Sequence, residues 1–130
     1  MIVVDASAVL EVLLGKEDGH RALDRMFQPG ESRHAPHLLD LEVAQVLRRY
    51  AASGELSATR GAEAIEELAI LGIERHGHLS LLPRIWELRR NMTAYDAAYV
   101  ALAEALEATL VTRDEKLART PGHRARVELI

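Results

Sequence analysis

The sequence of 130 residues contains no cysteine, which excludes disulfide bonds and thiolate metal sites. Any metal ion must therefore be bound by oxygen atoms or imidazole rings. Glycine and proline are also few, with 8 and 4 residues, and no linker, repeat or low-complexity segment interrupts the chain. We therefore expect a single domain, residues 1–130, which is long enough to enclose a hydrophobic core.

Long apolar runs are missing as well, and no segment approaches the length of a membrane span. The apolar N-terminus has no basic start and is interrupted by Asp5 and Glu11, so it is a poor signal peptide. Together with the lack of cysteine, this predicts a cytoplasmic protein without a membrane partner.

The net charge of −4 argues against a protein that coats nucleic acid by neutralising many phosphates. Lysine is nearly absent, because Lys16 and Lys116 are the only lysines among 16 basic residues. The others are arginines, which suit bidentate phosphate contacts. A general bias toward arginine codons is the more ordinary explanation of this excess.

Short strand-like segments alternate with helical patterns along the chain. Strands are predicted at 1–5, 32–36, within 73–79, at 109–112 and at 126–130, and helices at 7–15, 18–30, 37–52, 57–72, 79–91 and 93–107. This alternation predicts an α/β fold with a central parallel sheet covered by helices on both faces. The helix at 37–52 is expected to bury an apolar stripe of Leu39, Val43, Val46 and Tyr50.

Four acidic residues have ordinary structural explanations when each is considered alone. Thr93 followed by Asp96 is typical of a capping box, with the acid facing the helix dipole. Asp5 and Asp114 could cap the helices that follow them. Glu42 could be a solvated charge beside the apolar stripe of its helix.

The positions of these acids nevertheless favour a shared site. Asp5 directly follows the first strand, Asp114 follows the strand at 109–112, and Glu42 and Asp96 lie near helix starts. Groups beyond the carboxyl ends of parallel strands converge where open α/β folds bind ligands. Four carboxylates that meet there raise one another's pKa values or share a cation. Oxygen ligands select Mg²⁺ or Mn²⁺, and such an ion can activate water against a phosphodiester.

Four segments, VVDASAVLEVLL, LLDLEVAQVLRR, YDAAYVALAEAL and TLVTRDEKLAR, occur in an order and spacing that resemble a known family. The chain resembles the PIN-domain ribonucleases, in particular the VapC toxins of bacterial toxin–antitoxin pairs. This resemblance implies that the acids of the four motifs, Asp5, Glu42, Asp96 and Asp114, bind Mg²⁺ or Mn²⁺ and catalyse RNA cleavage. It further implies a homodimer and inhibition by a small cognate antitoxin of the VapB kind.

Three further residues are candidates near that site. Ser7 and Thr112 match hydroxyl positions of the family, and we expect them to contact a carboxylate or a metal-bound water. Arg113 lies on the segment that delivers Asp114, which makes it a candidate RNA contact. Some relatives have another acid where Lys116 and Leu117 stand here, so the sequence leaves open whether one or two ions bind.

Two rival functions remain. A phosphoacceptor domain also gathers aspartates at strand ends around Mg²⁺, but it needs an adjacent acid pair and a lysine after a late strand. The first strand here ends in the single acid Asp5. A catalytically inactive PIN-like binding module is the second rival, and the complete set of carboxylates argues against it.

Other residues have weaker signals. His76 and His78 share one face of the predicted strand and could contact zinc or nickel if a third ligand lay nearby. The other histidines, His20, His34, His37 and His123, are expected at the surface. Trp86 is expected in the core or an interface. The helices before Gly30 carry many apolar residues, which suits either core packing or an antitoxin groove.

Overall fold

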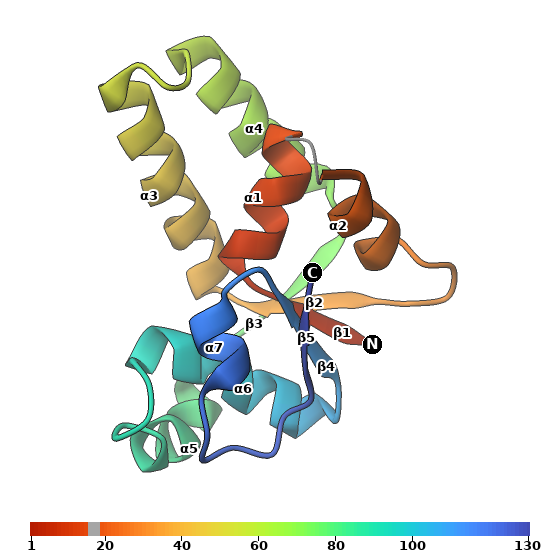
Figure 1. Ribbon diagram of the computed structural model, residues 1–130, viewed down its shortest axis with the longest axis vertical. Coiled ribbons are helices and arrows are strands. Elements are labelled where there is room, and N and C mark those ends of the chain that lie inside the picture. Colours follow the sequence, from red (N-terminus) through yellow and green to blue (C-terminus); the bar gives the residue numbers. More distant parts are fainter. Residues whose placement is uncertain (16–18) are drawn as a thin grey trace.

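The computed structural model describes residues 1–15 and 19–130, and it contains one parallel sheet with helices on both faces (Figure 1). The strands are β1 (Ile2–Val4), β2 (Arg33–Pro36), β3 (Ile73–His76), β4 (Thr109–Thr112) and β5 (Val127–Leu129). The helices are α1 (Ala6–Leu14), α2 (Gly19–Met26), α3 (Leu38–Ser53), α4 (Ala58–Ile70), the short 3-10 helix η1 (Leu79–Leu81), α5 (Leu82–Glu87), α6 (Ala94–Leu106) and α7 (Glu115–Arg119). The predicted α/β class is confirmed.

The sheet has the strand order β3-β2-β1-β4-β5, and all four strand pairs are parallel. Helices α1 to α4 lie above the sheet and α5 and α6 below it in the view of Figure 1. Both faces of the central strand are therefore covered, and Ile2, Val3 and Val4 are fully buried. This arrangement explains why β1 is apolar at every position rather than at alternate ones.

Four of the helix starts are fixed by side-chain caps. Asp5, Ser57, Thr93 and Asp114 are the N-caps of α1, α4, α6 and α7, and each accepts a hydrogen bond from a backbone N–H of the first turn. Helix α1 ends at Gly15, whose φ of 57° lies in the left-handed region that glycine adopts without strain. Two of the four acids therefore do cap helices, as their sequence positions suggested.

Helix α6 lies against the middle of the sheet. It packs on β1, β2 and β4, and its residues 97–103 are all buried. The alanines Ala97, Ala98, Ala101 and Ala103 let this helix approach the sheet closely. Because α6 is held so rigidly, the side chains of its first turn have fixed positions at the sheet edge.

Several sequence expectations were wrong in detail. Helix α3 buries Leu39, Val43 and Leu47, whereas Val46 and Tyr50 are only partly buried. Trp86 is 68% exposed, so it is not a core residue. The helix predicted at 79–91 is longer than the one observed, because α5 ends at Glu87. Arg89 and Arg90 lie in the turn that follows. The start of the helix predicted at 18–30, Asp18, lies outside the described residues.

His34 was expected at the surface but is only 5% exposed, because it lies on a strand inside the sheet. Of the apolar residues before Gly30, Val9, Leu13 and Met26 belong to the core, whereas Leu23 and Phe27 are exposed. None of the described helices is both long and apolar enough to cross a membrane.

Candidate active site

The candidate site lies where the direction of strand addition reverses. The chain builds the sheet from β1 through β2 to β3, then returns to the other side of β1 with β4 and β5. The carboxyl ends of β1 and β4 therefore mark the topological switch point, which is where open α/β sheets bind ligands. Asp5 directly follows β1, and Asp114 lies two residues beyond β4.

Asp5 is the most enclosed of the four acids, with 6% of its surface exposed. Its Oδ1 accepts hydrogen bonds from Ser7 Oγ (2.6 Å) and from the N–H of Ala8 (3.0 Å). Its Oδ2 accepts a hydrogen bond from the Thr112 hydroxyl. Burial raises the pKa of Asp5 above its ordinary value, although these hydrogen bonds oppose that rise. Because Oδ1 already accepts two bonds, Oδ2 is the oxygen with a lone pair left for a cation.

Glu42 lies in the second turn of α3 and is half-buried. Its Oε1 accepts a hydrogen bond of 2.6 Å from the hydroxyl of Tyr99, a residue of α6 that is 2% exposed. Burial raises the pKa of Glu42, the Tyr99 hydrogen bond lowers it, and the charges of Asp96 and Asp5 raise it further. Tyr99 therefore fixes the position of Glu42 and partly offsets the cost of its charge.

Asp96 lies in the first turn of α6, where its N–H donates to Thr93 Oγ1 over 3.1 Å. Its pKa is raised, first by burial and then by the charge of Asp114, while Thr93 and Lys116 lower it. Asp114 caps α7 through Oδ1 alone, which accepts from the N–H groups of Lys116 and Leu117. The capping hydrogen bonds therefore do not use Asp114 Oδ2.

The structure thus brings the four predicted acids into one electrostatic group. Asp5 interacts with Asp114, Asp96 with Asp114, and Glu42 with both Asp5 and Asp96. Each interaction raises a pKa, so the charges repel one another. These four are not among the sets of three or more ligand atoms within 4.8 Å of one another in the described part of the chain. In any three of these four acids, at least two of the ligand atoms are therefore more than 4.8 Å apart.

This donor set fits a hard divalent cation. All four side chains offer carboxylate oxygens, and a cation among them would offset both the burial and the mutual repulsion that raise the pKa values of Asp5, Glu42 and Asp96.

The three neighbouring candidates have defined positions. Thr112 is fully buried, and its Oγ1 also accepts the N–H of Asp114 over 3.0 Å. Ser7 Oγ accepts the N–H of Arg113 over 2.9 Å, so Ser7 and Thr112 join the ends of β1 and β4. The Arg113 side chain forms an ion pair of 2.8 Å with Glu11 of α1. Arg113 is therefore held at the site rather than extended into solvent.

Comparison of the sequence with known families gives a match to the PIN domain over residues 2–123. The chain belongs to the PIN-domain family. The match covers the whole sheet up to β4 and all four acids, so the family resemblance inferred from the four motifs is confirmed.

Relatives of this PIN-domain chain are ribonucleases. It is 48% identical over 120 residues to ribonuclease VapC9 of Mycobacterium tuberculosis, an alignment that covers 92% of this chain and 91% of the relative. Among solved structures, VapBC2 from Rickettsia felis bound to a DNA fragment from its promoter superposes with a TM-score of 0.71 at 14% identity, covering 99% of this chain and 98% of the other. VapC20 of Mycobacterium tuberculosis, a toxin that cleaves the sarcin–ricin loop, superposes with a TM-score of 0.68 at 15% identity, covering 91% and 93%. These two superpositions show the shared PIN fold.

Two residues of this PIN-domain site were not found by sequence reasoning. Tyr99 was read only as part of an apolar helix, although it lies three positions after Asp96 and so on the same helix face. Glu11 was noted only as an interruption of the apolar N-terminus. Its pairing with Arg113 joins α1 to the end of β4 and has no local sequence signal.

Proposed function

We propose that this protein is a metal-dependent endoribonuclease toxin that acts in the cytoplasm. The observation that carries the proposal is the group of four carboxylates, Asp5, Glu42, Asp96 and Asp114, at the switch point of a PIN fold. The 48% identity to a VapC ribonuclease supports RNA as the substrate class.

The roles of the four acids follow from their environments. Asp5 is the rigid anchor, because its oxygens are held by Ser7, Thr112 and the backbone of Ala8. Together with Asp96 and Asp114 it would hold Mg²⁺ or Mn²⁺. When bound, the cation supplies positive charge beside the scissile phosphate and makes water more acidic. Glu42 has a raised pKa, which suits a group that accepts a proton from the attacking water.

Incubation of the purified protein with cellular RNA tests this function. Cleavage products are expected with Mg²⁺ or Mn²⁺ and none with EDTA. Mapping of the new RNA ends then identifies the target. An intact RNA population with either metal would contradict the proposal and favour the inactive binding module.

Replacing Tyr99 with phenylalanine tests whether Tyr99 positions Glu42. The change keeps the buried ring but removes the hydrogen bond that lowers the pKa of Glu42. We expect cleavage to fall about tenfold at neutral pH, as for the loss of one hydrogen bond to a charged group. The acidic limb of the pH–rate profile should move to higher pH, because Glu42 then becomes harder to ionise.

The matched control is Tyr50→Phe, since Tyr50 lies on the same face of the sheet as Glu42 but near the far end of α3. This variant should keep the native pH profile. Native cleavage and a native pH profile in Tyr99→Phe would show that Tyr99 has only a packing role, because phenylalanine keeps the buried ring.

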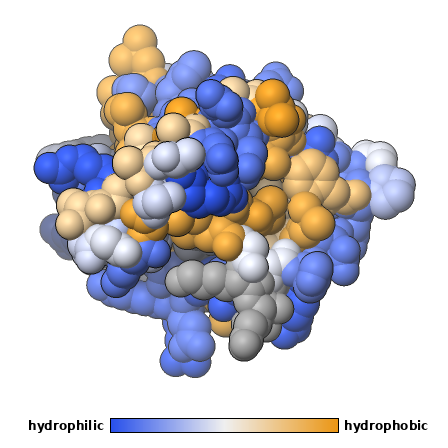
Figure 2. Space-filling model, turned by 90° about the horizontal axis from the view of Figure 1, so that it is seen from above, coloured by the Kyte–Doolittle hydropathy of each residue, from blue (hydrophilic) through white to orange (hydrophobic). Residues whose placement is uncertain are grey.

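The natural inhibitor is proposed to be a small antitoxin of the VapB kind, as the VapBC2 complex suggests. The helices above the sheet offer apolar surface for it, because Leu23 and Phe27 of the α2 region and Ile65 of α4 are exposed. Figure 2 views the end of the molecule that carries α3 and α4. Apolar side chains reach the surface there, among polar ones. Coexpression with a neighbouring small gene should yield a complex that no longer cleaves RNA.

The toxin is also proposed to be a homodimer. Large apolar side chains are exposed on η1, α5 and the first turns of α3 and α6, and Leu41, Leu82 and Tyr95 of this group line a mostly apolar cavity of about 300 Å³. Burying such side chains between two copies removes them from water. Light scattering should give twice the chain mass of 14.4 kDa.

The phosphoacceptor alternative is disfavoured by the burial of Asp5. An aspartate that receives a phosphoryl group needs an oxygen that the phosphoryl donor can reach, but Asp5 is only 6% exposed. Lys116 is an exposed residue of α7 rather than a residue at the end of a strand.

A further inference from the structure

A second group of ligand-type side chains lies on strands β2 and β3, where the site described above has no residue. His34 of β2 is in register with Glu74 of β3, and His76 follows Glu74 by two positions. Side chains two residues apart on a strand point to the same face, so all three lie on one face of the sheet. In the described part of the chain, these three residues form a group of potential metal ligands whose ligand atoms all lie within 4.8 Å of one another.

The atoms of this group converge on one point. His34 Nδ1 is 2.9 Å from His76 Nε2 and 3.6 Å from Glu74 Oε2. The two rings are tilted by 42° with centroids 5.1 Å apart, so they do not stack. In a tetrahedral zinc site with bonds near 2.05 Å, ligand atoms are about 3.3 Å apart. The two observed separations lie on either side of that value.

Ser32 orients the buried ring. Its Oγ lies 2.8 Å from His34 Nε2, on the opposite side of the ring from His76. In the tautomer of His34 whose Nε2–H donates to Ser32, the Nδ1 lone pair faces the shared point. Metal-binding histidines are commonly held in this way by a second partner. Burial also lowers the pKa of His34, which keeps the ring neutral at neutral pH.

We propose that His34, Glu74 and His76 form a second metal site, which binds a late first-row transition-metal cation of the Zn²⁺ class. Two imidazoles and one carboxylate suit zinc, whereas Mg²⁺ prefers oxygen ligands alone. The two sites of the molecule would therefore select different metals. A fourth ligand position is left to water, because Glu74 is exposed and the site opens to solvent there.

The position of the cluster indicates what the ion would do. β3 is an edge strand of the sheet, and a metal bound across β2 and β3 would join it to its neighbour. The backbone N–H of His37 also donates to the carbonyl of His76 over 3.0 Å, at the start of α3. The ion would therefore stabilise the segment from which α3, and with it Glu42, extends.

The test is a Zn²⁺ titration of tag-free, EDTA-treated protein by calorimetry at pH 7.5. The acidic site is silenced by the double substitution Asp96→Asn with Asp114→Asn, so that only the second site responds. One equivalent of Zn²⁺ should bind in this background and raise the unfolding temperature. Adding His76→Gln should weaken binding by at least about tenfold and remove the thermal shift.

His78→Gln is the matched control, because His78 is an exposed histidine two residues from His76. Added to the double-substituted protein, His78→Gln should leave the affinity for Zn²⁺ unchanged. Equal affinity in the His76→Gln and His78→Gln proteins, or no Zn²⁺ binding in the parent, would overturn the proposal. Metal-free unfolding of His76→Gln verifies that the variant folds. RNA cleavage plays no part in this readout, so its outcome is independent of the nuclease assignment.

Discussion

Replacing Asp96 with asparagine is expected to reduce metal-dependent RNA cleavage by about 10²- to 10³-fold. The change keeps the shape of the side chain but removes one negative charge from the group of Asp5, Glu42 and Asp114. A carboxylate that holds a catalytic cation contributes several kcal/mol to the charge stabilisation of the transition state, and each 1.36 kcal/mol is about tenfold in rate. The rate of RNA cleavage at saturating Mg²⁺ or Mn²⁺ measures this loss.

The same substitution should stabilise the metal-free protein. The pKa values of Asp5, Glu42 and Asp96 are all raised in the fold, so their protonated forms favour folding. That contribution is fully present below the pKa of the unfolded carboxyl groups and is lost as pH rises through the folded values. At neutral pH the ionised group therefore destabilises the fold, and neutralising Asp96 relieves part of the repulsion.

Thermal unfolding with and without Mg²⁺ separates this effect from misfolding. The native protein should gain stability when Mg²⁺ is added, whereas Asp96→Asn should begin at a higher unfolding temperature and gain less. The control is Asp24→Asn, an exposed aspartate of α2 that should change neither cleavage nor the response to metal. Full cleavage activity in Asp96→Asn would remove this carboxylate from the site.

The sequence predicted the α/β fold and placed the four acids near strand ends or helix starts, because both follow from local patterns. Strand β1 is apolar at every position, and helix starts are marked by Asp5, Ser57 and Thr93. Once the strands are known to be parallel, residues that follow them must share one edge. The order of the strands was not predictable in this way, and the switch point between β1 and β4 emerged only from the structure.

Residues whose roles depend on partners far along the chain were missed. His34 was expected at the surface because a single histidine in a short strand carries no sign of burial, yet it contacts His76, 42 positions away. The sequence pattern instead paired His76 with His78, which lies beyond the end of β3. Tyr99 and Glu42 are 57 positions apart, so their hydrogen bond had no local signal either.

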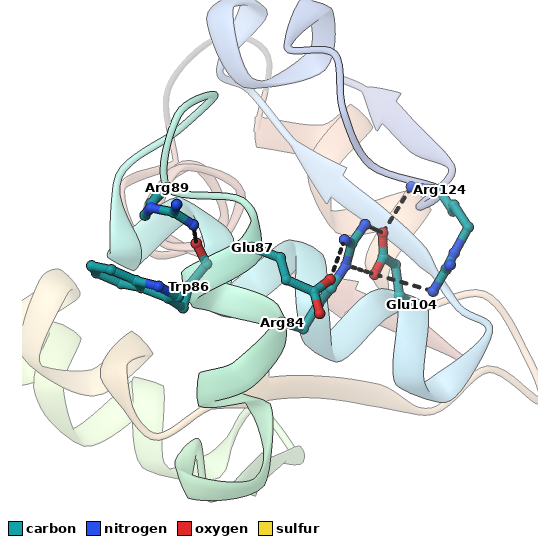
Figure 3. Close-up of polar contacts among 6 residues, drawn as sticks. All are labelled: Arg84, Trp86, Glu87, Arg89, Glu104 and Arg124. Atoms are coloured by element: carbon teal, nitrogen blue, oxygen red, sulfur yellow. Dashed lines mark hydrogen bonds and ion pairs between the residues drawn. The ribbon is translucent and has the colours of Figure 1, made fainter.

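The ion-pair network around Glu104 also joins residues that are far apart in the sequence. It is expected to have a large effect on the free energy of unfolding. Glu104 lies on α6, and its side chain is 7% exposed. It accepts hydrogen bonds from Arg84 of α5, with Nε at 2.7 Å and Nη2 at 3.0 Å, and from the backbone N–H of Arg124 at 2.7 Å. Figure 3 shows Arg84 and Arg124 approaching the carboxylate from opposite sides. One carboxylate therefore joins α5, α6 and the segment that leads to β5.

Replacing Glu104 with glutamine is expected to lower the free energy of unfolding by about 2–3 kcal/mol at pH 7. The amide replaces one acceptor oxygen by a donor, which removes the bidentate partner of the partly buried Arg84 and leaves it only the exposed Glu87 as a counter-charge. Urea unfolding measures the difference. The control is Glu87→Gln, which pairs with the same Arg84 but is 64% exposed and should cost less than about 0.5 kcal/mol.

The pH dependence of this difference identifies its origin. Arg84 and the Arg124 N–H lower the pKa of Glu104, so its stabilising contribution is complete above the pKa of an unfolded glutamate. That contribution is lost as pH falls through the lower pKa of the folded state. Native protein and Glu104→Gln should therefore converge in stability in acid. A constant gap across the whole pH range would show that the loss comes from packing rather than from the charge of Glu104.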